Sequence, residues 1–511
     1  MTTTLRLAGI NERRCIVRQT LDYYRCLIVG GIYECSIADG PPKDWIRQSA
    51  IKAIKHCIAT HPVLSTTIIG EATESPAYAR PPHLDLNNHV QLLEGKDVSD
   101  RYDAMLERDV IKLVIPQIHD QVLTARDEIP PWKVVIVPLA SRNGRNRYLI
   151  LLAYYHSHGD GKSGLAFHQS FLSGLRMSSS PTCPYDDETK ISLSDAATTK
   201  PLPPPIDEGG QLKITWSYLL SPLLGAYLPK TITDYFNLRA AATPESPDQW
   251  RGEPTFHDDD NPSTFKTGLD FVTVNNETMT KVLAKCKSHS TKFTGLLHQL
   301  IVRALSQGIP AETAGSFVSG TAVDLRRHAA SLSDDDMAVC ASVYFELFAR
   351  ADVNAWTGWA AAADDASIWV ASRATTEGLA RRAESLVDQP VGLLAYLRNF
   401  YPWMKDQVGK PRDSSYELSN LLSFSPRAEP QSTSTTSPRD TEDWTLSSVL
   451  FSQPANAVGS GLNFNVVTLK GGDMVLMLTW QLGVLGVDDE QRFAERVCSS
   501  IGSSLDVLAS A

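Results

Sequence analysis

Two apolar segments separated by a tight turn are the feature that most constrains the fold of this chain. Residues 130–139 (PPWKVVIVPL) and 146–155 (NRYLILLAYY) are rich in β-branched, aromatic and aliphatic side chains, as strands are. Asn143 and Gly144 lie between them, and an Asn-Gly pair is a strong signal for the two-residue turn of a β-hairpin. We therefore expect two antiparallel strands in this region.

The second segment leads directly into a short polar motif, YYHSHGDGKSG (residues 154–164). Beyond it, residues 163–175 place Phe167, Phe171 and Leu175 at helical spacing. The motif is therefore predicted to form a loop between a strand and a helix. Loops held by rigid elements often carry catalytic groups, so this loop is the candidate functional site.

The motif matches three kinds of chemistry in part, and the first of these is phosphate binding. A phosphate-binding loop of the GxxxxGK[ST] type ends like Gly161-Lys162-Ser163, but its first glycine is replaced here by His156. A bulky side chain at that position would obstruct the tight turn that wraps the phosphates. The sequence therefore disfavours a nucleotide site.

The second chemistry is metal-assisted hydrolysis. His156, His158 and Asp160 alternate as in the HxHxDH motif of metallo-β-lactamase-like hydrolases, but Gly161 replaces the last histidine. No histidine occurs in residues 169–256, so the ligands that would complete a coordination sphere are missing. The metal hypothesis is therefore weak.

Two acidic clusters, residues 257–260 (HDDD) and 334–336 (DDD), resemble metal sites only at first sight. Adjacent carboxylates point in different directions, and no ligand spacing accompanies either cluster. We predict solvated loops at both places, and no metal.

The third chemistry is acyl transfer, which needs one accessible histidine and one carboxylate nearby. Histidine can accept a proton from an alcohol near neutral pH and return it within one cycle. His156 is the candidate base and His158 the alternative, while Asp160 and Gly161 supply a tight turn. Gly161 is expected to serve this turn because glycine adopts positive φ without strain.

The rest of the chain alternates strands and helices, which predicts an α/β fold. Residues 177–210 lose periodicity and contain PLPPP, so we place a linker there between lobes at 1–205 and 211–511. Residues 425–443 are predicted to form a flexible surface loop. We expect further helices over 44–60, 277–289, 293–307 and 488–509, and strands over 63–69, 267–274, 316–324, 462–469 and 474–482.

Composition excludes some classes of protein. At 511 residues the chain exceeds one ordinary core, and its net charge of −10 argues against a nucleic-acid binder. The eight cysteines are scattered without a CxxC pair, which predicts reduced thiols. No apolar segment has the length of a signal peptide or a membrane span, so we predict a cytoplasmic location and leave peripheral contact with a lipid surface open.

His156-x-x-x-Asp160-Gly161 after an apolar strand resembles the HxxxDG signature of the chloramphenicol-acetyltransferase-like superfamily, which includes plant BAHD acyltransferases and peptide-synthetase condensation domains. The specific resemblance is to alcohol acetyltransferases of the yeast and fungal type, to which trichothecene O-acetyltransferases are related. Tyr155 stands where condensation domains have another histidine, which favours a free-standing acyltransferase. The DFGWG segment of the plant enzymes is absent, so other residues must supply what it contributes to the architecture there. The segments HPVLSTTI, IPPWKVVIV, AVDLRRH, ELSNLLSF and GGDMVLMLTW extend the resemblance over most of the chain.

The resemblance implies two lobes, each a mixed sheet flanked by helices, with a tunnel between them. His156 would act as general base. Asp160 would turn away from the substrate and pair with an arginine, for which Arg326 in VDLRRH is the candidate. Asn420 in SNLLSF is the candidate donor to the developing oxyanion.

The resemblance also implies the substrates. We expect acyl-CoA, and acetyl-CoA in particular, as the co-substrate and a small-molecule or natural-product alcohol as the acceptor. We expect no permanently bound cofactor, no nucleic-acid partner, no integral membrane segment and a monomeric chain. Three alternatives stay open: a condensation-type enzyme that uses a carrier-protein thioester or an amine acceptor, a metallo-hydrolase, and an inactive binding protein.

Overall fold

The computed structural model covers the whole chain. It describes residues 2–36, 44–93, 102, 105–178, 180, 182–193, 200–208, 212–220, 246–310, 312–329, 332–349, 366–427 and 443–510. Most of the predicted surface loop at 425–443, and parts of the predicted linker at 177–210, lie outside the described residues.

A five-stranded sheet carries the candidate loop. Its strand order is β14-β2-β8-β7-β6, and all neighbouring pairs are antiparallel except β6 with β7. The strands are β14 (Thr445–Ser452), β2 (Cys26–Cys35), β8 (Arg145–Tyr155), β7 (Trp132–Arg142) and β6 (Val90–Leu92). Because β14 comes from the C-terminal part of the chain, this sheet joins segments from both predicted lobes.

The predicted hairpin is confirmed as β7 and β8. Trp132 pairs with Tyr154 at one end of the ladder and Arg142 with Arg145 at the other. Asn143 and Gly144 adopt positive φ angles of 53° and 72°, as the tight turn requires. The loop after β8 is therefore fixed to a strand that is buried inside the sheet.

A second, six-stranded sheet has the order β10-β16-β15-β13-β11-β12. Here β13 lies parallel to both β11 and β15, whereas the other neighbours are antiparallel. The strands are β10 (Thr267–Val274), β16 (Met474–Gln481), β15 (Leu462–Leu469), β13 (Tyr416–Phe424), β11 (Ser316–Asp324) and β12 (Ala341–Ala349). This sheet confirms the predicted strands at 267–274, 316–324, 462–469 and 474–482.

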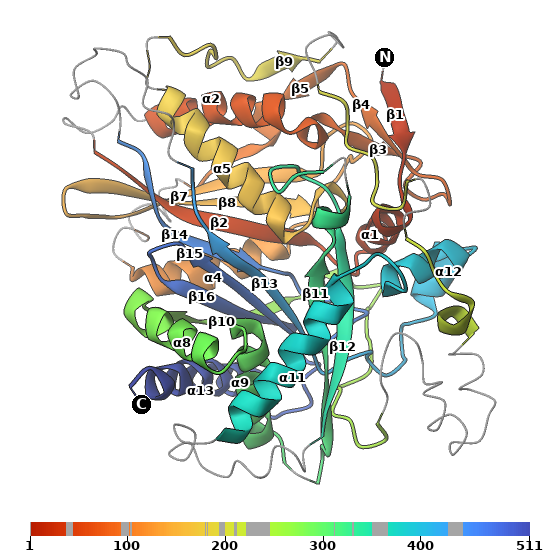
Figure 1. Cartoon of the computed structure of the whole chain (residues 1–511). Helices are drawn as coiled ribbons and strands as arrows, with labels where there is room; N and C mark the ends of the chain where they lie inside the picture. The colour runs from red at the N-terminus through yellow and green to blue at the C-terminus, as the bar shows by residue number, and fades with distance from the viewer. Residues whose placement is uncertain are drawn as a thin grey trace.

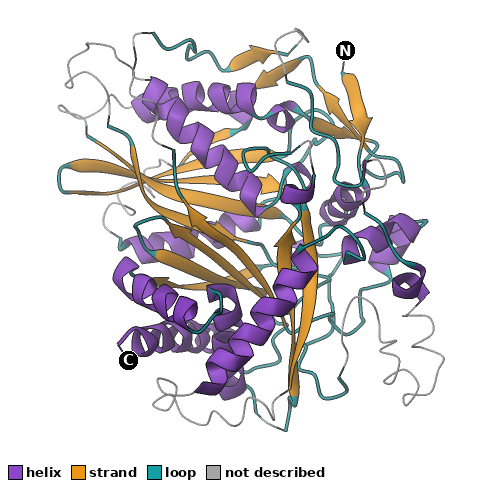
Figure 2. Ribbon diagram, viewed as in Figure 1, coloured by secondary structure: helices purple, strands orange, loops and turns teal. Residues whose placement is uncertain are grey.

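Helices cover the outer faces of both sheets. Figures 1 and 2 show α2 and α5 over the five-stranded sheet, α8, α9 and α13 over the six-stranded sheet, and α11 beside β11 and β12. The longer helices are α1 (Ile10–Thr20), α2 (Trp45–Thr60), α4 (Glu107–His119), α5 (Gly161–Ser178), α8 (Asn276–Ser288), α9 (Phe293–Gly308), α11 (Ala366–Ala383) and α13 (Glu490–Ser510), and α12 (Phe400–Lys405) is short. The helices expected at 44–60, 163–175, 277–289, 293–307 and 488–509 are confirmed.

Successive side chains of β8 point to opposite faces of the sheet, so this strand contributes to two different hydrophobic cores. Leu152 packs with Ile54 of α2 and Phe171 of α5. Its neighbour Leu151 faces the other way, into a cluster that includes α4, β10 and β16. The two sheets therefore share apolar packing through α4 and do not form separate bodies.

Small elements complete the fold, and one of them corrects an expectation. The strand expected over 63–69 is wrong in its first half, because Pro62–Ser65 forms the 3-10 turn η1, which Pro62 begins, and only Thr67–Ile69 (β3) is extended. None of the helices in the described part of the chain is long and apolar enough to span a membrane. The remaining elements are β1 (Thr3–Leu7), β4 (Ala77–Arg80), β5 (His83–Asp85), β9 (Lys190–Ser192), η2 (Leu86–Asn88), η3 (His156–His158), η5 (Pro262–Thr264), η6 (Arg326–His328) and η8 (Pro390–Tyr396).

Candidate functional site

The candidate loop is short and tightly held. It runs from the end of β8 through the 3-10 turn η3 and enters α5 at Gly161. The hydroxyl of Tyr154, on β8, donates to the carbonyl oxygen of Asp160 at 2.6 Å. Strand and helix therefore fix the loop from both ends, as the sequence predicts.

The Asp160 carboxylate is paired with Arg326. Nη1 of Arg326 donates to Oδ2 of Asp160 at 2.8 Å, and Nη2 donates to Oδ1 at 2.7 Å. The backbone N–H of Cys340 and that of Ser163 also donate to this carboxylate, at 3.0 and 3.1 Å. The structure therefore joins the two residues that the resemblance pairs, and the carboxylate points toward Arg326.

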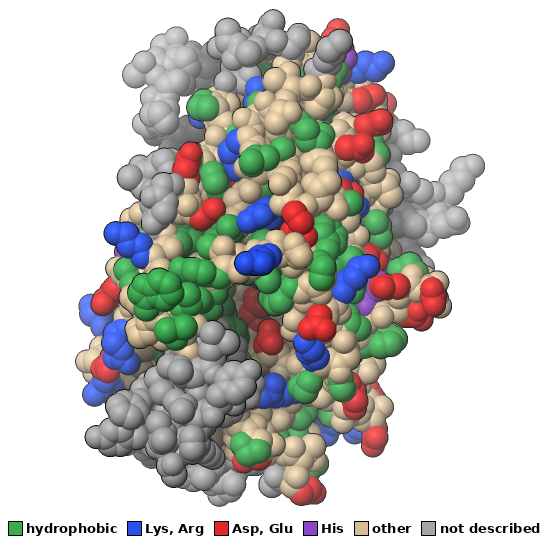
Figure 3. All heavy atoms as spheres, turned by 90° about the vertical axis from the view of Figure 1, so that its right-hand side faces the viewer, with side chains coloured by type: hydrophobic (Ala, Val, Ile, Leu, Met, Phe, Trp, Pro, Cys, Tyr) green, Lys and Arg blue, Asp and Glu red, His purple; other side chains and the backbone are tan. Residues whose placement is uncertain are grey.

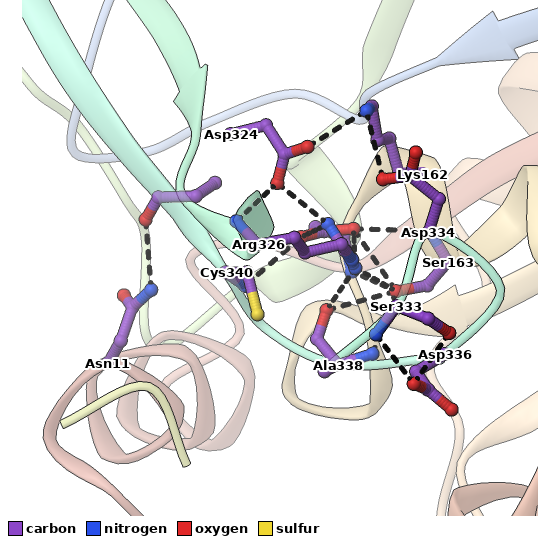
Figure 4. A network of polar contacts seen from close by, with 12 residues as sticks. Asn11, Lys162, Ser163, Asp324, Arg326, Ser333, Asp334, Asp336, Ala338 and Cys340 are labelled. Carbon is purple, nitrogen blue, oxygen red and sulfur yellow. Dashed lines mark hydrogen bonds and ion pairs between the residues drawn. The ribbon is translucent and has the colours of Figure 1, made fainter. Parts of the chain in front are cut away.

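Arg326 connects the start of α5 to the end of β11. Figure 4 shows its guanidinium enclosed by Asp324, Ser163, Ala338 and Cys340. Nη1 also donates to Oδ1 of Asp324 at 3.2 Å, and Nη2 also donates to the carbonyl oxygen of Ala338 at 2.9 Å. With a side chain that is 2% exposed, Arg326 acts as a buried connection between segments far apart in sequence.

The charges of this pair are mutually stabilised. Burial alone would raise the pKa of Asp160, but the Arg326 guanidinium lowers that pKa below its usual value. Burial would likewise lower the pKa of Arg326, and Asp160 raises it instead. Both groups are therefore charged at neutral pH, and this loop carries a buried ion pair.

Gly161 is needed for close packing. Its φ is not positive, so the turn predicted to require glycine is wrong at this position, which is already the first residue of α5. A Cβ placed there would lie 2.6 Å from Cδ2 of Leu421 and 3.0 Å from Cζ of Phe451. Glycine thus lets the start of α5 approach β13 and β14.

His158 has both ring nitrogens occupied. Nδ1 lies 3.1 Å from Oγ of Ser157, and Nε2 lies 3.0 Å from the carbonyl oxygen of Thr66. Its side chain is 1% exposed, and burial lowers its pKa to about 4. This histidine is a neutral structural group, and nothing in its surroundings favours it as the alternative base.

His156 has different surroundings. Its side chain is only partly buried, whereas Tyr155, Ser157 and His158 around it are buried, and its Nδ1 has no hydrogen-bond partner among the described residues. The ring of Tyr24 lies 5.9 Å away, between ring centroids. Because its side chain is partly exposed and no described residue is hydrogen-bonded to its buried Nδ1, the imidazole of His156 is held less firmly than that of His158.

Cys15 of α1 lies close to His156, and each of the two groups shifts the pKa of the other. Burial alone would lower the pKa of His156, but Cys15 and, more weakly, Asp160 raise it above its usual value, against an opposing effect of Arg14. Burial would raise the pKa of the Cys15 thiol, yet His156 lowers it to about 7. The thiol and the imidazole therefore form a coupled pair in which each stabilises the charged form of the other.

Replacement of Cys15 by alanine should move the acid side of the pH–rate profile to lower pH. A protonated imidazole cannot accept a proton, so kcat/KM falls below the pKa of the base. Removing the thiol takes away the main interaction that raises the pKa of His156, and that pKa must fall. The measurement is kcat/KM against pH, with Cys286→Ala, a buried thiol on α8, as control. An acid limb that stays in place would show that Cys15 does not act on the base.

Asn420 lies on β13 and faces the helix layer. Its Nδ2 donates to Oγ1 of Thr294 at 3.1 Å, and its Oδ1 accepts from the backbone N–H of Leu422 at 2.8 Å. Leu422 has a positive φ of 65°, so the strand is irregular at this point. The structure brings Asn420 to Thr294 of α9, and its oxyanion role stays a prediction.

The residues of the other two chemistries do not converge on one site. Lys162 lies 2.8 Å from Oδ2 of Asp324, so its ammonium faces a carboxylate. His158 and Asp160 face Thr66 and Arg326 respectively. Within the described ranges, no group of three or more His, Cys, Asp or Glu side chains is arranged to hold a metal ion.

Sequence reasoning missed the residues near His156 that come from α1 and from the segment just before β2. Arg14, Cys15 and Tyr24 lie more than a hundred residues before the motif. The segment INERRCIVRQT carries no known motif, and only the fold places it against η3. No signal in the sequence could have identified them.

Solved structures place this architecture among the acetyltransferase and condensation-domain folds. TRI3 trichothecene 15-O-acetyltransferase from Fusarium sporotrichioides matches with a TM-score of 0.68 and 12% identity, covering 99% of this chain and 95% of its own. The condensation domain of the Monacolin K polyketide synthase MokA matches with a TM-score of 0.55 and 11% identity, covering 100% and 98%. The fold class is therefore the two-lobed α/β fold of these proteins.

Within this class the chain belongs to the alcohol acetyltransferase family, whose family model matches residues 7–499. A probable alcohol acetyltransferase of Fusarium pseudograminearum, FCK4, is 26% identical over 85% of this chain and 82% of its own. A second, crmB of Aspergillus fumigatus, is 24% identical over 91% of both chains. The family predicted from the HxxxDG motif is confirmed.

Proposed function

We propose that the protein transfers an acetyl group from acetyl-CoA to the hydroxyl of a small-molecule alcohol, with His156 as general base. The observation that carries the proposal is the contrast between two neighbouring histidines: both ring nitrogens of the buried His158 are hydrogen-bonded, whereas the side chain of His156 is partly exposed and its Nδ1 has no partner among the described residues. Membership of the alcohol acetyltransferase family supports the same reaction class.

In the proposed mechanism His156 accepts the proton of the acceptor hydroxyl as its oxygen attacks the thioester carbonyl of acetyl-CoA. The tetrahedral intermediate then collapses, the carbon–sulfur bond breaks, and the CoA sulfur takes the proton from His156. The products are an acetate ester and free CoA, so atoms and charge balance without an enzyme-bound acyl group. General-base help of this kind contributes about 10²- to 10⁴-fold to the rate.

Asp160 and Arg326 act in this proposal as positioning residues. Their buried ion pair holds the loop between β8 and α5, and Asp160 also contributes to the raised pKa of His156. A raised pKa suits a base that must both take and return a proton near neutral pH. Gly161 serves the same geometry because it allows α5 to begin close to β13.

Several finer predictions belong to the proposal. We propose CoA as the carrier of the acetyl group, with a carrier-protein thioester as the alternative donor. We also propose a natural-product alcohol as acceptor, a monomeric chain, a cytoplasmic location, and lobes at 1–205 and 211–511 that enclose a tunnel.

Incubation of the purified protein with acetyl-CoA and a panel of hydroxylated metabolites should yield products heavier by one acetyl group, together with stoichiometric free thiol. Mass spectrometry detects the ester, and a thiol reagent detects the released CoA. Parallel reactions with an acetylated carrier protein separate the two donors. Release of CoA without an ester would instead indicate thioester hydrolysis and contradict acetyl transfer.

A further inference from the structure

A small pocket contains two arginines from α1, the helix that packs against η3. The pocket has a volume of about 170 Å³ and lies where α1 meets α12, β13 and the loop at 456–460. Arg14 and Arg18 line it one helical turn apart, so both side chains lie on the same side of α1. Figure 3 faces this side of the molecule and shows a hollow near its centre with acidic side chains inside it.

The positive charge of these arginines is not compensated by an ion pair. Nη2 of Arg18 donates to the neutral Oδ1 of Asn456 at 2.9 Å, and Nε of Arg14 donates to the neutral Oδ1 of Asn11 at 3.1 Å. Across the part of the chain that the structure describes, neither guanidinium lies within ion-pair distance of a carboxylate.

Arg18 also has an unused donor. Its side chain is 9% exposed, and its buried Nε has no hydrogen-bond partner among the described residues. Buried polar groups in folded proteins nearly always have a partner, so Arg18 is a pocket-lining arginine whose hydrogen bonds the described residues do not complete. Burial and Arg14 also lower the pKa of Arg18, which means that its charged form is destabilised. A bound negative charge would stabilise that charged form.

Two carboxylates line the same pocket and limit the size of the charge it can take. Asp413 and Glu417 both contribute to the lining, and Oε1 of Glu417 accepts from Nε2 of Gln453 at 3.2 Å. With two guanidinium groups and two carboxylates, the pocket has no large excess of positive charge. A single negative charge, such as a carboxylate, fits this balance better than a doubly charged phosphate.

The distance between Arg18 and His156 indicates which of the two substrates the pocket binds. The guanidinium carbon of Arg18 lies 4.3 Å from the ring centroid of Tyr24, and that ring lies 5.9 Å from the ring of His156, so Arg18 and His156 are no more than about 10 Å apart. In CoA the thioester sulfur and the nearest phosphorus are separated by about thirteen bonds, roughly 15 Å when extended. The pocket is therefore too close to the base for the phosphates of an extended CoA.

We propose that the acceptor is a hydroxylated carboxylic acid, whose carboxylate binds Arg14 and Arg18 while its hydroxyl reaches His156. This inference rests on the proposed function and names the substrate class for the same site. In this proposal the guanidinium groups of Arg14 and Arg18, which both line the pocket, donate charge-assisted hydrogen bonds to the carboxylate.

Calorimetric titration tests the inference without relying on turnover. The probes are 6-hydroxyhexanoate, which spans about 8 Å from hydroxyl to carboxylate, and its methyl ester, which has the same skeleton without the charge. The wild-type protein should bind the acid about tenfold or more tightly than the ester, as expected for a charge-assisted hydrogen bond. The variants Arg18→Met and Arg14→Met should lose this preference, Arg18→Lys should keep part of it, and Arg492→Met, an exposed arginine of α13, should behave like wild type.

Equal binding of acid and ester by the wild type, or no binding of the acid at millimolar concentration, would overturn the inference. So would a preference that survives in both methionine variants. The same variants are titrated with CoA and with pantetheine, which lacks the phosphates. If Arg18→Met weakens CoA alone, the pocket serves the donor and the assignment to the acceptor is wrong. Because binding is measured directly, loss of the proposed catalytic mechanism would leave these outcomes unchanged.

Discussion

Replacement of His156 by alanine is expected to reduce acetyl transfer by about 10²- to 10⁴-fold while the thermal midpoint changes little. The loss follows from the proposed role, because the neighbouring histidine, His158, is not placed to replace His156 as the base. His158 has both nitrogens occupied and a pKa of about 4. The preserved stability follows from the free Nδ1 and the partial exposure of His156, since the substitution breaks no fixed hydrogen bond to that nitrogen.

Two other histidines provide matched controls for this experiment. His158→Ala removes buried hydrogen bonds to Ser157 and Thr66, so it should lower the thermal midpoint. His83→Ala changes an exposed residue of β5 and should affect neither activity nor stability. The measurement is the initial rate of ester formation together with thermal unfolding of each variant. Full turnover by the His156 variant would refute the proposed base.

The parts of the fold that were predictable from sequence are those fixed by local pattern. The β7–β8 hairpin follows from two apolar segments and an Asn-Gly turn, and α5 follows from apolar spacing immediately after the motif. The ends of these elements meet at residues 156–160, so the position of the candidate loop could also be predicted. Local pattern alone is therefore enough to predict where the candidate loop lies.

The parts that were not predictable depend on contacts between distant segments. Strand β14 pairs with β2 although about 410 residues separate them, and no local feature of TLSSVLFS indicates that partner. The pKa of the Cys15 thiol is lowered only because α1 packs against η3, which places the thiol beside His156. The pairing of Arg326 follows from resemblance to a family motif and not from local pattern, since arginine side chains are mostly exposed in folded proteins.

Gly161 and Asn420 are residues that the sequence singles out without predicting the contacts that they make. The sequence singles out Gly161 for positive φ, whereas the fold requires it because Leu421 and Phe451 approach its Cα. Asn420 is singled out as a donor, and the fold shows its amide donating to Thr294. Both roles depend on which residues the second sheet places nearby. The sequence around Gly161 or Asn420 does not indicate those neighbours.

Disruption of the Asp160–Arg326 pair is expected to destabilise the fold by about 3–5 kcal/mol, because removing one partner leaves the other charge buried and unpaired. Asp160→Ala leaves the Arg326 guanidinium, 2% exposed, with only Asp324 as a charged neighbour at 3.2 Å. Arg326→Met leaves the Asp160 carboxylate with only backbone and hydroxyl donors from Ser163 and Cys340. Urea and thermal unfolding measure both losses, and Glu277→Gln in the exposed pair with Lys281 should change stability little.

The double variant Asp160→Ala/Arg326→Met tests whether the two residues stabilise the fold as a coupled ion pair or through independent contacts. When both charges are removed, neither is left unpaired, so the double variant should be less destabilised than the two single variants added together. Strict additivity would mean that the pair is not energetically coupled. Activity gives a second test, because loss of the pair also releases the loop that carries His156. The folded double variant should therefore still catalyse acetyl transfer more slowly than the wild-type protein. Full activity of this variant would exclude a positioning role for the pair.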